Sequence, residues 1–190
     1  GIEVVIDEAL SPRGTEFAWD GEALGRLADE TFDHPVAEDT IKMHILFVDG
    51  HDARDDSDGQ ALGVSWANQN VVIYKQRLEE VCETDAGETL RRRGLVERVC
   101  NETELIIWTH EIGHVLGLVN FCLPMVEDHE DPDHEYHDHN PECVMYWAFE
   151  RRQAFENIGD RFVEDEDVAL GFDDACEADI AAVRDSDGAQ

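Results

Sequence analysis

The sequence is short of basic residues and of long apolar segments. Only 14 lysine and arginine residues stand against 46 aspartate and glutamate residues, which gives a formal net charge of −32. Such a charge argues against non-specific attraction to nucleic acid or to an anionic membrane. The longest apolar stretch, Val115–Val126, is interrupted by Asn120 and Pro124 and is too short to span a membrane. We therefore expect no nucleic-acid partner and no membrane contact from this segment.

Lysine is scarcest of all, because Lys42 and Lys75 are the only two. Acid-rich, lysine-poor composition resembles that of proteins from salt-loving archaea. A surface of this kind repels itself at low ionic strength and is tolerable where salt screens it. The alternative is an acidic protein that uses carboxylates to hold calcium. Hydrophobic residues make up 42% of the chain, which argues against disorder and suffices for the core of one domain over residues 1–190.

The five cysteines show no CxxC or zinc-ribbon spacing, so the sequence does not indicate a thiolate metal site. Disulfides suit an exported protein, and the preferred pairs are Cys82–Cys100 and Cys122–Cys143. The odd count leaves at least one free thiol, and sequence alone does not fix the connectivity. The chain begins without a charged and then apolar leader, so we expect any signal peptide to be absent or removed. We expect an extracellular or cell-surface location.

Short β-branched runs and helical spacing predict a mixed architecture. The predicted elements are strands at 2–6, 41–48, 61–67 and 70–75, and helices at 19–34, 148–157 and 173–185. The acidic segment Asp49–Gly59 lacks the spacing of an EF-hand loop, so we interpret it as a solvated turn rather than a calcium cradle. Phe121–Glu142 is irregular, acidic and rich in histidine. This order favours a small α+β domain with a cleft between lobes of about 1–118 and 119–190.

The most informative stretch contains His110-Glu111-Ile112-Gly113-His114, an HExxH pattern. Residues four apart lie on one face of a helix, so His110 and His114 can both face a single ion. Glu111 follows the first of them, where its carboxylate can hold and deprotonate a metal-bound water. Two histidines and a glutamate would be costly to bury on an apolar helix without a partner ion.

Signals around this motif predict the bounds of its helix. Asn101 and Glu104 resemble a capping box, which places the start near Glu102. Gly117 can take the left-handed conformation that ends a helix. The apolar side expected to face a core consists of Leu105, Ile112, Val115 and Leu116.

His110–Leu118 resembles the zinc helix of the metzincin metallopeptidases, and is most similar to that of the matrixins. The extended metzincin pattern is HExxHxxGxxH followed by a Met-turn. In this chain Asn120 stands where the pattern has its third histidine. Asparagine is a weak zinc ligand compared with imidazole, so Asn120 is an unfavourable replacement.

The downstream residues resemble the matrixin pattern H-S-x-x-x-x-A-L-M-Y-P, in which the third histidine stands eight residues before the Met-turn methionine. Here His137 stands eight residues before Met145. The resemblance thus implies a 17-residue insertion that moves the third histidine from position 120 to position 137. His129, His134 and His139 are the competing candidates, with His134 the runner-up.

The resemblance implies a metzincin-like fold with a twisted, mostly parallel sheet, a long zinc-binding helix forming the floor of a cleft, and a loop-rich C-terminal half. It implies one catalytic zinc ion held by His110, His114 and His137, with Glu111 as general base. Met145 would be an apolar platform beneath the metal. Tyr146 would be either a core residue, the preferred interpretation, or an oxyanion helper. Calcium is a second candidate ion.

The expected function is that of a monomeric zinc endopeptidase acting on peptides or proteins. An extended substrate could add to the edge of either of the strands predicted at 61–67 and 70–75. Two alternatives stay open: a hydrolase of another amide that uses the same water-activating chemistry, and a zinc-binding protein without activity.

Overall fold

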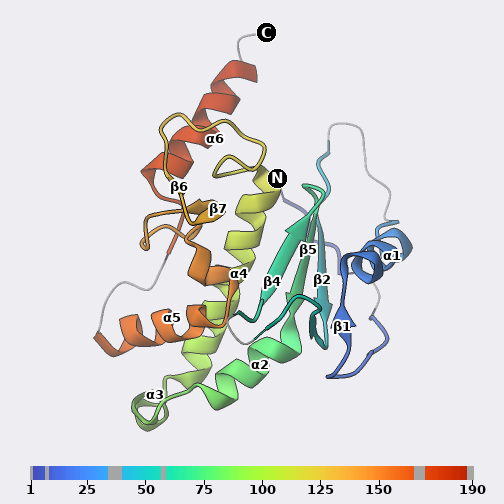
Figure 1. Ribbon diagram of the computed structural model, residues 1–190, viewed down its shortest axis with the longest axis vertical. Coiled ribbons are helices and arrows are strands. Elements are labelled where there is room, and N and C mark those ends of the chain that lie inside the picture. The colour runs from blue at the N-terminus through green and yellow to red at the C-terminus, as the bar shows by residue number, and fades with distance from the viewer. Residues whose placement is uncertain (1, 7–8, 34–39, 57–58, 165–169, 188–190) are drawn as a thin grey trace.

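The computed structural model describes residues 2–6, 9–33, 40–56, 59–164 and 170–187. Its elements are β1 (Ala18–Trp19), α1 (Gly21–Thr31), β2 (His44–Val48), β3 (His51–Asp52), β4 (Gly63–Trp66), β5 (Asn70–Tyr74), α2 (Lys75–Thr84), α3 (Glu88–Arg93), α4 (Val96–Leu116), β6 (Glu130–Asp131), β7 (His134–Asp138), the 3₁₀ helix η1 (Trp147–Glu150), α5 (Gln153–Glu164) and α6 (Asp174–Asp187). Helices and small sheets are mixed along the chain, which confirms the α+β class. Figure 1 shows α4 between the sheet and the C-terminal segments.

A three-stranded sheet in the order β2-β5-β4 frames the first half of the chain. β2 runs parallel to β5. β4 runs antiparallel to β5, and the turn that joins these two strands contains Ala67 and Asn68, both with positive φ. β4 is therefore an edge strand. The other pairs are β1–β3, which is parallel, and β6–β7, which is antiparallel. The strand pairing is thus mixed, and the expectation of a mostly parallel sheet is wrong.

Helices cover both faces of this sheet, so its central strand is buried along its whole length. Val72 and Tyr74 of β5 pack towards Leu24 and Leu27 of α1. Because side chains of a strand alternate between faces, Val71 and Ile73 point to the other side and join the core around α4. The helix predicted at 19–34 is confirmed as α1 with its buried side, but it is shorter than predicted: Trp19 lies in β1, the helix ends at Thr31, and residue 34 lies outside the described residues.

Helix α4 has 21 residues and spans about 30 Å at 1.5 Å per residue. It contacts β4, β5, α2, α5 and η1. Its end at Gly117, with φ of 86°, is as predicted, whereas its start at Val96 precedes the predicted capping box. The predicted core face is also wrong in part: Leu105 is 57% and Leu116 48% exposed. The buried side chains lie instead on the stripe that carries Ile106, Ile107 and the histidines of the motif.

Other expectations for single elements need correction. Residues 2–6 form no strand, and Ile2, Val4 and Ile6 are exposed, because none of the described strands pairs with this segment. The polar segment after β5 forms α2 and α3. The acidic segment Asp49–Gly59 includes the short strand β3, although positions 57 and 58 lie outside the described residues. The helix predicted at 148–157 is split into η1 and α5, and the last predicted helix is confirmed as α6.

One disulfide joins Cys82 of α2 to Cys100 of α4, as predicted. The second predicted pair, Cys122–Cys143, is wrong. Cys122 is exposed and free, whereas Cys143 is buried with its Sγ 3.8 Å from the Sγ of Cys176. Packing of the Met-turn against α6 brings these two thiols together.

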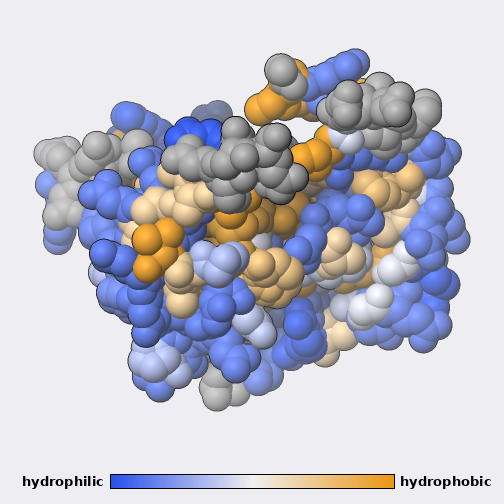
Figure 2. Space-filling view, turned by 90° about the horizontal axis from the view of Figure 1, so that it is seen from above, coloured by the Kyte–Doolittle hydropathy of each residue, from blue (hydrophilic) through white to orange (hydrophobic). Residues whose placement is uncertain are grey.

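Among the described residues, no helix is both long enough and apolar enough to span a membrane. Hydrophilic residues occupy much of the periphery of the face in Figure 2, with hydrophobic residues gathered towards its centre. This distribution accords with the acidic composition of the chain.

Candidate metal centre

The last turns of α4 bury the HExxH motif. His110 and Glu111 are fully buried, and His114 is 7% exposed. The two histidines lie one helical turn apart, and their Nε2 atoms approach to 3.1 Å. Two imidazoles in such contact cannot both be cationic, so at least one ring is neutral. Because a neutral imidazole offers a lone pair, the pair is suited to sharing a ligand.

The hydrogen bond at the far side of the His110 ring fixes its orientation. His110 Nδ1 donates to the carbonyl oxygen of Val144 at 2.7 Å, because a carbonyl can only accept. The Nε2 lone pair is therefore left facing His114. A histidine that donates one ring N–H to a backbone carbonyl and turns the other nitrogen inward has the arrangement typical of a metal ligand.

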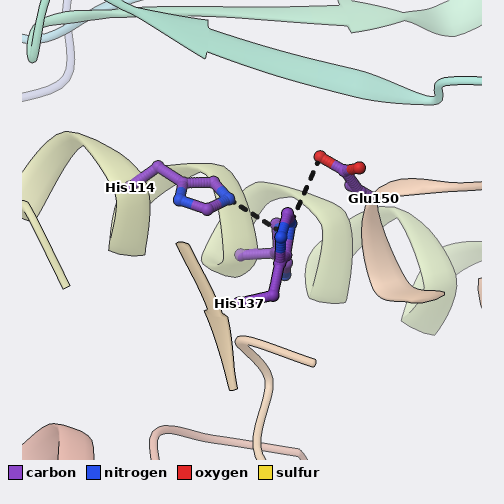
Figure 3. A group of neighbouring side chains, drawn as sticks. His114, His137 and Glu150 are labelled. Atoms are coloured by element: carbon purple, nitrogen blue, oxygen red, sulfur yellow. Dashed lines mark hydrogen bonds and ion pairs between the residues drawn. The ribbon is translucent and has the colours of Figure 1, made fainter. Parts of the chain in front are cut away.

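His137 joins the pair from β7 in the same manner. Its Nδ1 donates to the carbonyl oxygen of Glu135 at 2.9 Å. Its ring centroid lies 5.3 Å from that of His110 and 5.0 Å from that of His114. Since the first two rings are 4.8 Å apart, the three imidazoles form a nearly equilateral group. Figure 3 shows the His114 and His137 rings together with the Glu150 carboxylate.

Glu150 is the member of the group that the sequence did not indicate. It lies at the end of η1, and its Oε2 is 3.5 Å from His137 Nε2. His110, His114, His137 and Glu150 each offer one donor atom, and these atoms lie within 4.8 Å of one another. The group could therefore hold a metal ion. Glu150 stands five residues after Met145, at a position that the matrixin pattern does not include.

The surroundings keep the two helix imidazoles neutral and the carboxylate of Glu150 ionised. Burial, together with the neighbouring His137, lowers the pKa of His110 to about 4. Burial and the His110 ring lower the pKa of His114 well below 6.5. Although burial opposes it, the contact with His137 holds the pKa of Glu150 below its usual range. Near pH 7 both helix histidines therefore offer a lone pair, the form in which imidazole binds metals.

Glu111 lies beside this group without a partner. Neither carboxylate oxygen has a hydrogen bond within the described part of the chain. Burial, and after it the charge of Glu150, raises the pKa of Glu111 well above 4.5. A buried carboxylate that is left unpaired is expensive unless it has a function or an additional ligand nearby.

Met145 packs under the motif. It is fully buried, and a Cβ on Gly113 would overlap its Sδ. Glycine between the two histidines thus allows the methionine to lie against the helix. Tyr146 is partly buried and packs on the same core, with its ring 5.9 Å from that of Phe149. This position agrees with the preferred interpretation of Tyr146 as a core residue.

The other candidates for a third ligand lie elsewhere. His134 stacks on Trp147 with ring centroids 4.3 Å apart. His139 Nδ1 donates to the carbonyl oxygen of His129 at 2.8 Å. The side-chain amide of Asn120 donates to the Glu130 carboxylate at 3.1 Å, and the backbone of Asn120 has a φ of 61°. His129 is buried in a second group of acidic side chains, described below.

A cleft of about 340 Å³ opens over the motif. Its walls include Glu111, His114, His137 and Glu150, together with Val64 and Ser65 of the edge strand β4.

In the acidic segment after β2, Asp52 accepts hydrogen bonds from Arg54 and from the Tyr74 hydroxyl, the latter at 3.0 Å. Among the described residues, that segment supplies no member of a candidate metal group.

No family model, no curated protein and no solved structure matches this chain.

Proposed function

We propose that this protein is a zinc-dependent endopeptidase of metzincin type. The observation that carries the proposal is the group of three imidazoles beside an unpartnered, buried glutamate at the wall of an open cleft. His110, His114 and His137 would hold the ion, and Glu111 would be the general base. Three nitrogen donors with a carboxylate base beside them suit peptide hydrolysis by a zinc-activated water.

The donor set fits zinc better than calcium. Zinc favours three or four nitrogen, sulfur or carboxylate donors, whereas calcium takes six to eight oxygens. The neutral imidazoles and the backbone hydrogen bonds that orient two of them add to this fit. When bound, zinc supplies Lewis-acid chemistry that acidifies water and polarises a carbonyl group.

The chain's own residues would supply the proton transfers and the positioning. Glu111 would accept a proton from the attacking water at a carboxylate oxygen and deliver it to the nitrogen of the leaving amine. Its burial favours this role because a carboxylate with a raised pKa is a stronger base. Met145 and the Val144 carbonyl would keep the His110 side of the site fixed.

The cleft favours an extended peptide as the substrate. β4 is an edge strand of the sheet, and its residues Val64 and Ser65 line the cleft. An extended chain could pair with this edge and pass its scissile bond over the histidines. The Cys82–Cys100 disulfide favours an oxidising compartment, so we propose an extracellular or cell-surface enzyme. We also propose that the enzyme works as a monomer in salt.

Glu150 favours a second candidate function. If its carboxylate took the fourth coordination position, the site would be closed, as structural zinc sites are, and the protein would bind zinc without catalysis. The remaining alternative is hydrolysis of another amide.

Zinc content measured together with cleavage of an unfolded protein in high salt separates these three functions. The peptidase requires one zinc ion at this site and cleavage that stops when a chelator removes it. Bound zinc with no turnover of any amide would identify the closed site. Turnover confined to small amides would identify the other hydrolase.

A further inference from the structure

A second group of metal-binding side chains lies apart from the cleft. His129, Asp138, Asp173 and Cys176 each offer a donor atom, and these atoms lie within 4.8 Å of one another. They come from three segments: the inserted segment after α4, the end of β7, and the start of α6. Figure 1 shows β6, β7 and the lower part of α6 close together.

The two nitrogens of His129 have different surroundings. Nδ1 is 2.7 Å from Oδ2 of Asp138, inside the group, and Nε2 is 3.0 Å from Oδ2 of Asp179, outside it. A carboxylate on the outer nitrogen is the usual means of orienting a metal-binding histidine. His129 Nδ1 and Asp138 Oδ2 lie at hydrogen-bond distance, so an ion held by both would replace the proton between them. Asp138 Oδ2 also lies 4.0 Å from the Sγ of Cys176.

The group carries more negative charge than its protein partners balance. Asp138 and Asp179 are fully buried, and Asp173 is partly buried. In the described part of the chain, the ion pairs of Asp138 and Asp179 are with His129 alone. Asp173 accepts hydrogen bonds from the Asn140 side chain and from the backbone of Cys176. Even a protonated His129 leaves three carboxylates facing one positive charge, and buried charges need a counter-ion.

We propose that His129, Asp138, Asp173 and Cys176 bind a second divalent metal ion of zinc type, with Asp179 orienting His129 from outside. A set of one nitrogen, two oxygens and one sulfur suits a four-coordinate zinc site. It does not suit calcium, which avoids thiolate and needs more oxygens.

This ion would link the segment that carries His129 to the rest of the domain. Asp138 directly follows His137, so the ion would fix the end of the strand that presents His137 to the first site. The backbone supports this role, since Asp138 N donates to the Met145 carbonyl oxygen at 2.9 Å. The second site does not depend on peptidase activity and stands even if the first site has another function.

Two other states of the same residues make different predictions. His129 could serve as a buried cation between Asp138 and Asp179, with no metal. Alternatively, Cys176 could form a disulfide with Cys143, whose Sγ is 3.8 Å away, if a disulfide oxidant removed two electrons and two protons from the thiols. In either state Cys176 is not a ligand.

The test is metal content and cobalt spectroscopy of the whole chain in high salt. We expect two zinc ions per chain after loading and dialysis. Replacing zinc by Co²⁺ should produce the near-ultraviolet charge-transfer absorption of a thiolate–cobalt bond, which only the second site can give because the first contains no cysteine. Cys176→Ser should lose this absorption and one ion. The matched control Cys143→Ser, a neighbouring buried thiol outside the group, should keep both.

His110→Ala separates the two sites, because it should lose one ion and keep the thiolate absorption. Wild-type protein with one ion and the thiolate absorption would contradict the first site and support the second. Wild-type protein without that absorption would overturn the second site whatever the variants do, so the test does not depend on their folding. Alkylation in denaturant without reductant should label three cysteines. Labelling of Cys122 alone would reveal the Cys143–Cys176 disulfide and overturn the proposal.

Discussion

Replacing Glu111 by glutamine tests the assigned base with little disturbance to the fold. The substitution keeps the shape of the side chain, and neither oxygen of Glu111 has a hydrogen bond to lose among the described residues. The proposed zinc donors His110 and His114 are unchanged. We therefore expect the variant to fold and to bind zinc as the wild type does.

Activity should fall steeply in the same variant. Loss of a general base costs about 10²–10⁴-fold in rate, which corresponds to about 3–5 kcal/mol of activation free energy. The assay is kcat/KM for cleavage of an unfolded protein in high salt, with zinc content measured on the same sample. The control is Glu97→Gln, an exposed glutamate in the first turn of the same helix, which should behave as wild type. More than a tenth of wild-type activity in Glu111→Gln with zinc bound would refute the mechanism.

Three further predictions concern stability. Because the net charge is −32, the melting temperature should rise with sodium chloride, whose screening length falls from about 10 Å at 0.1 M to about 3 Å at 1 M. A melting temperature that does not change with salt would contradict the salt-adapted interpretation. Reducing the Cys82–Cys100 disulfide, which spans a sequence separation of 18, should lower the free energy of unfolding by about 3 kcal/mol in denaturant titrations, whereas Cys122→Ser should not. Although burial opposes it, the hydrogen bonds and charge of Arg54 lower the pKa of Asp52 below 3.8. The stability that Asp52 contributes is therefore present above that pH and is lost as the pH falls below it. Asp52→Asn should make stability less dependent on pH in this acidic range, and an unchanged pH dependence would count against the pairing of Asp52 with Arg54.

The sequence located the centre of the site because its chemistry is local. His110, Glu111 and His114 lie within one helical turn, and Gly117 ends that helix by a backbone conformation that glycine favours. The spacing from His137 to Met145 is also short, so it can be read without the residues that precede it. Each of these signals depends on residues close together in the chain.

What the sequence did not reveal depends on packing between distant segments. Asn101 and Glu104 have the letters of a capping box, but α4 starts earlier because it follows α3 after a left-handed turn at Gly94. Residues 2–6 have strand-forming side chains, but no strand in the described part of the chain pairs with them. Local propensity is overridden by such tertiary context.

The same reason explains the missed partners of the sites. Cys143 is nearer in sequence to Cys122, yet it faces Cys176 because α6 packs on the Met-turn. Glu150 enters the metal group only because η1 turns its side chain towards His137. Neither contact has a signal in residue spacing.

The most direct test of the central claim is a crystal structure of the zinc-loaded protein, with the ion located by its anomalous scattering. We predict an ion about 2.0–2.1 Å from the Nε2 atoms of His110, His114 and His137, with a coordination position open to the cleft. An ion held by Asn120 or by another histidine while His137 points away, or no ion at all between His110 and His114, would contradict it.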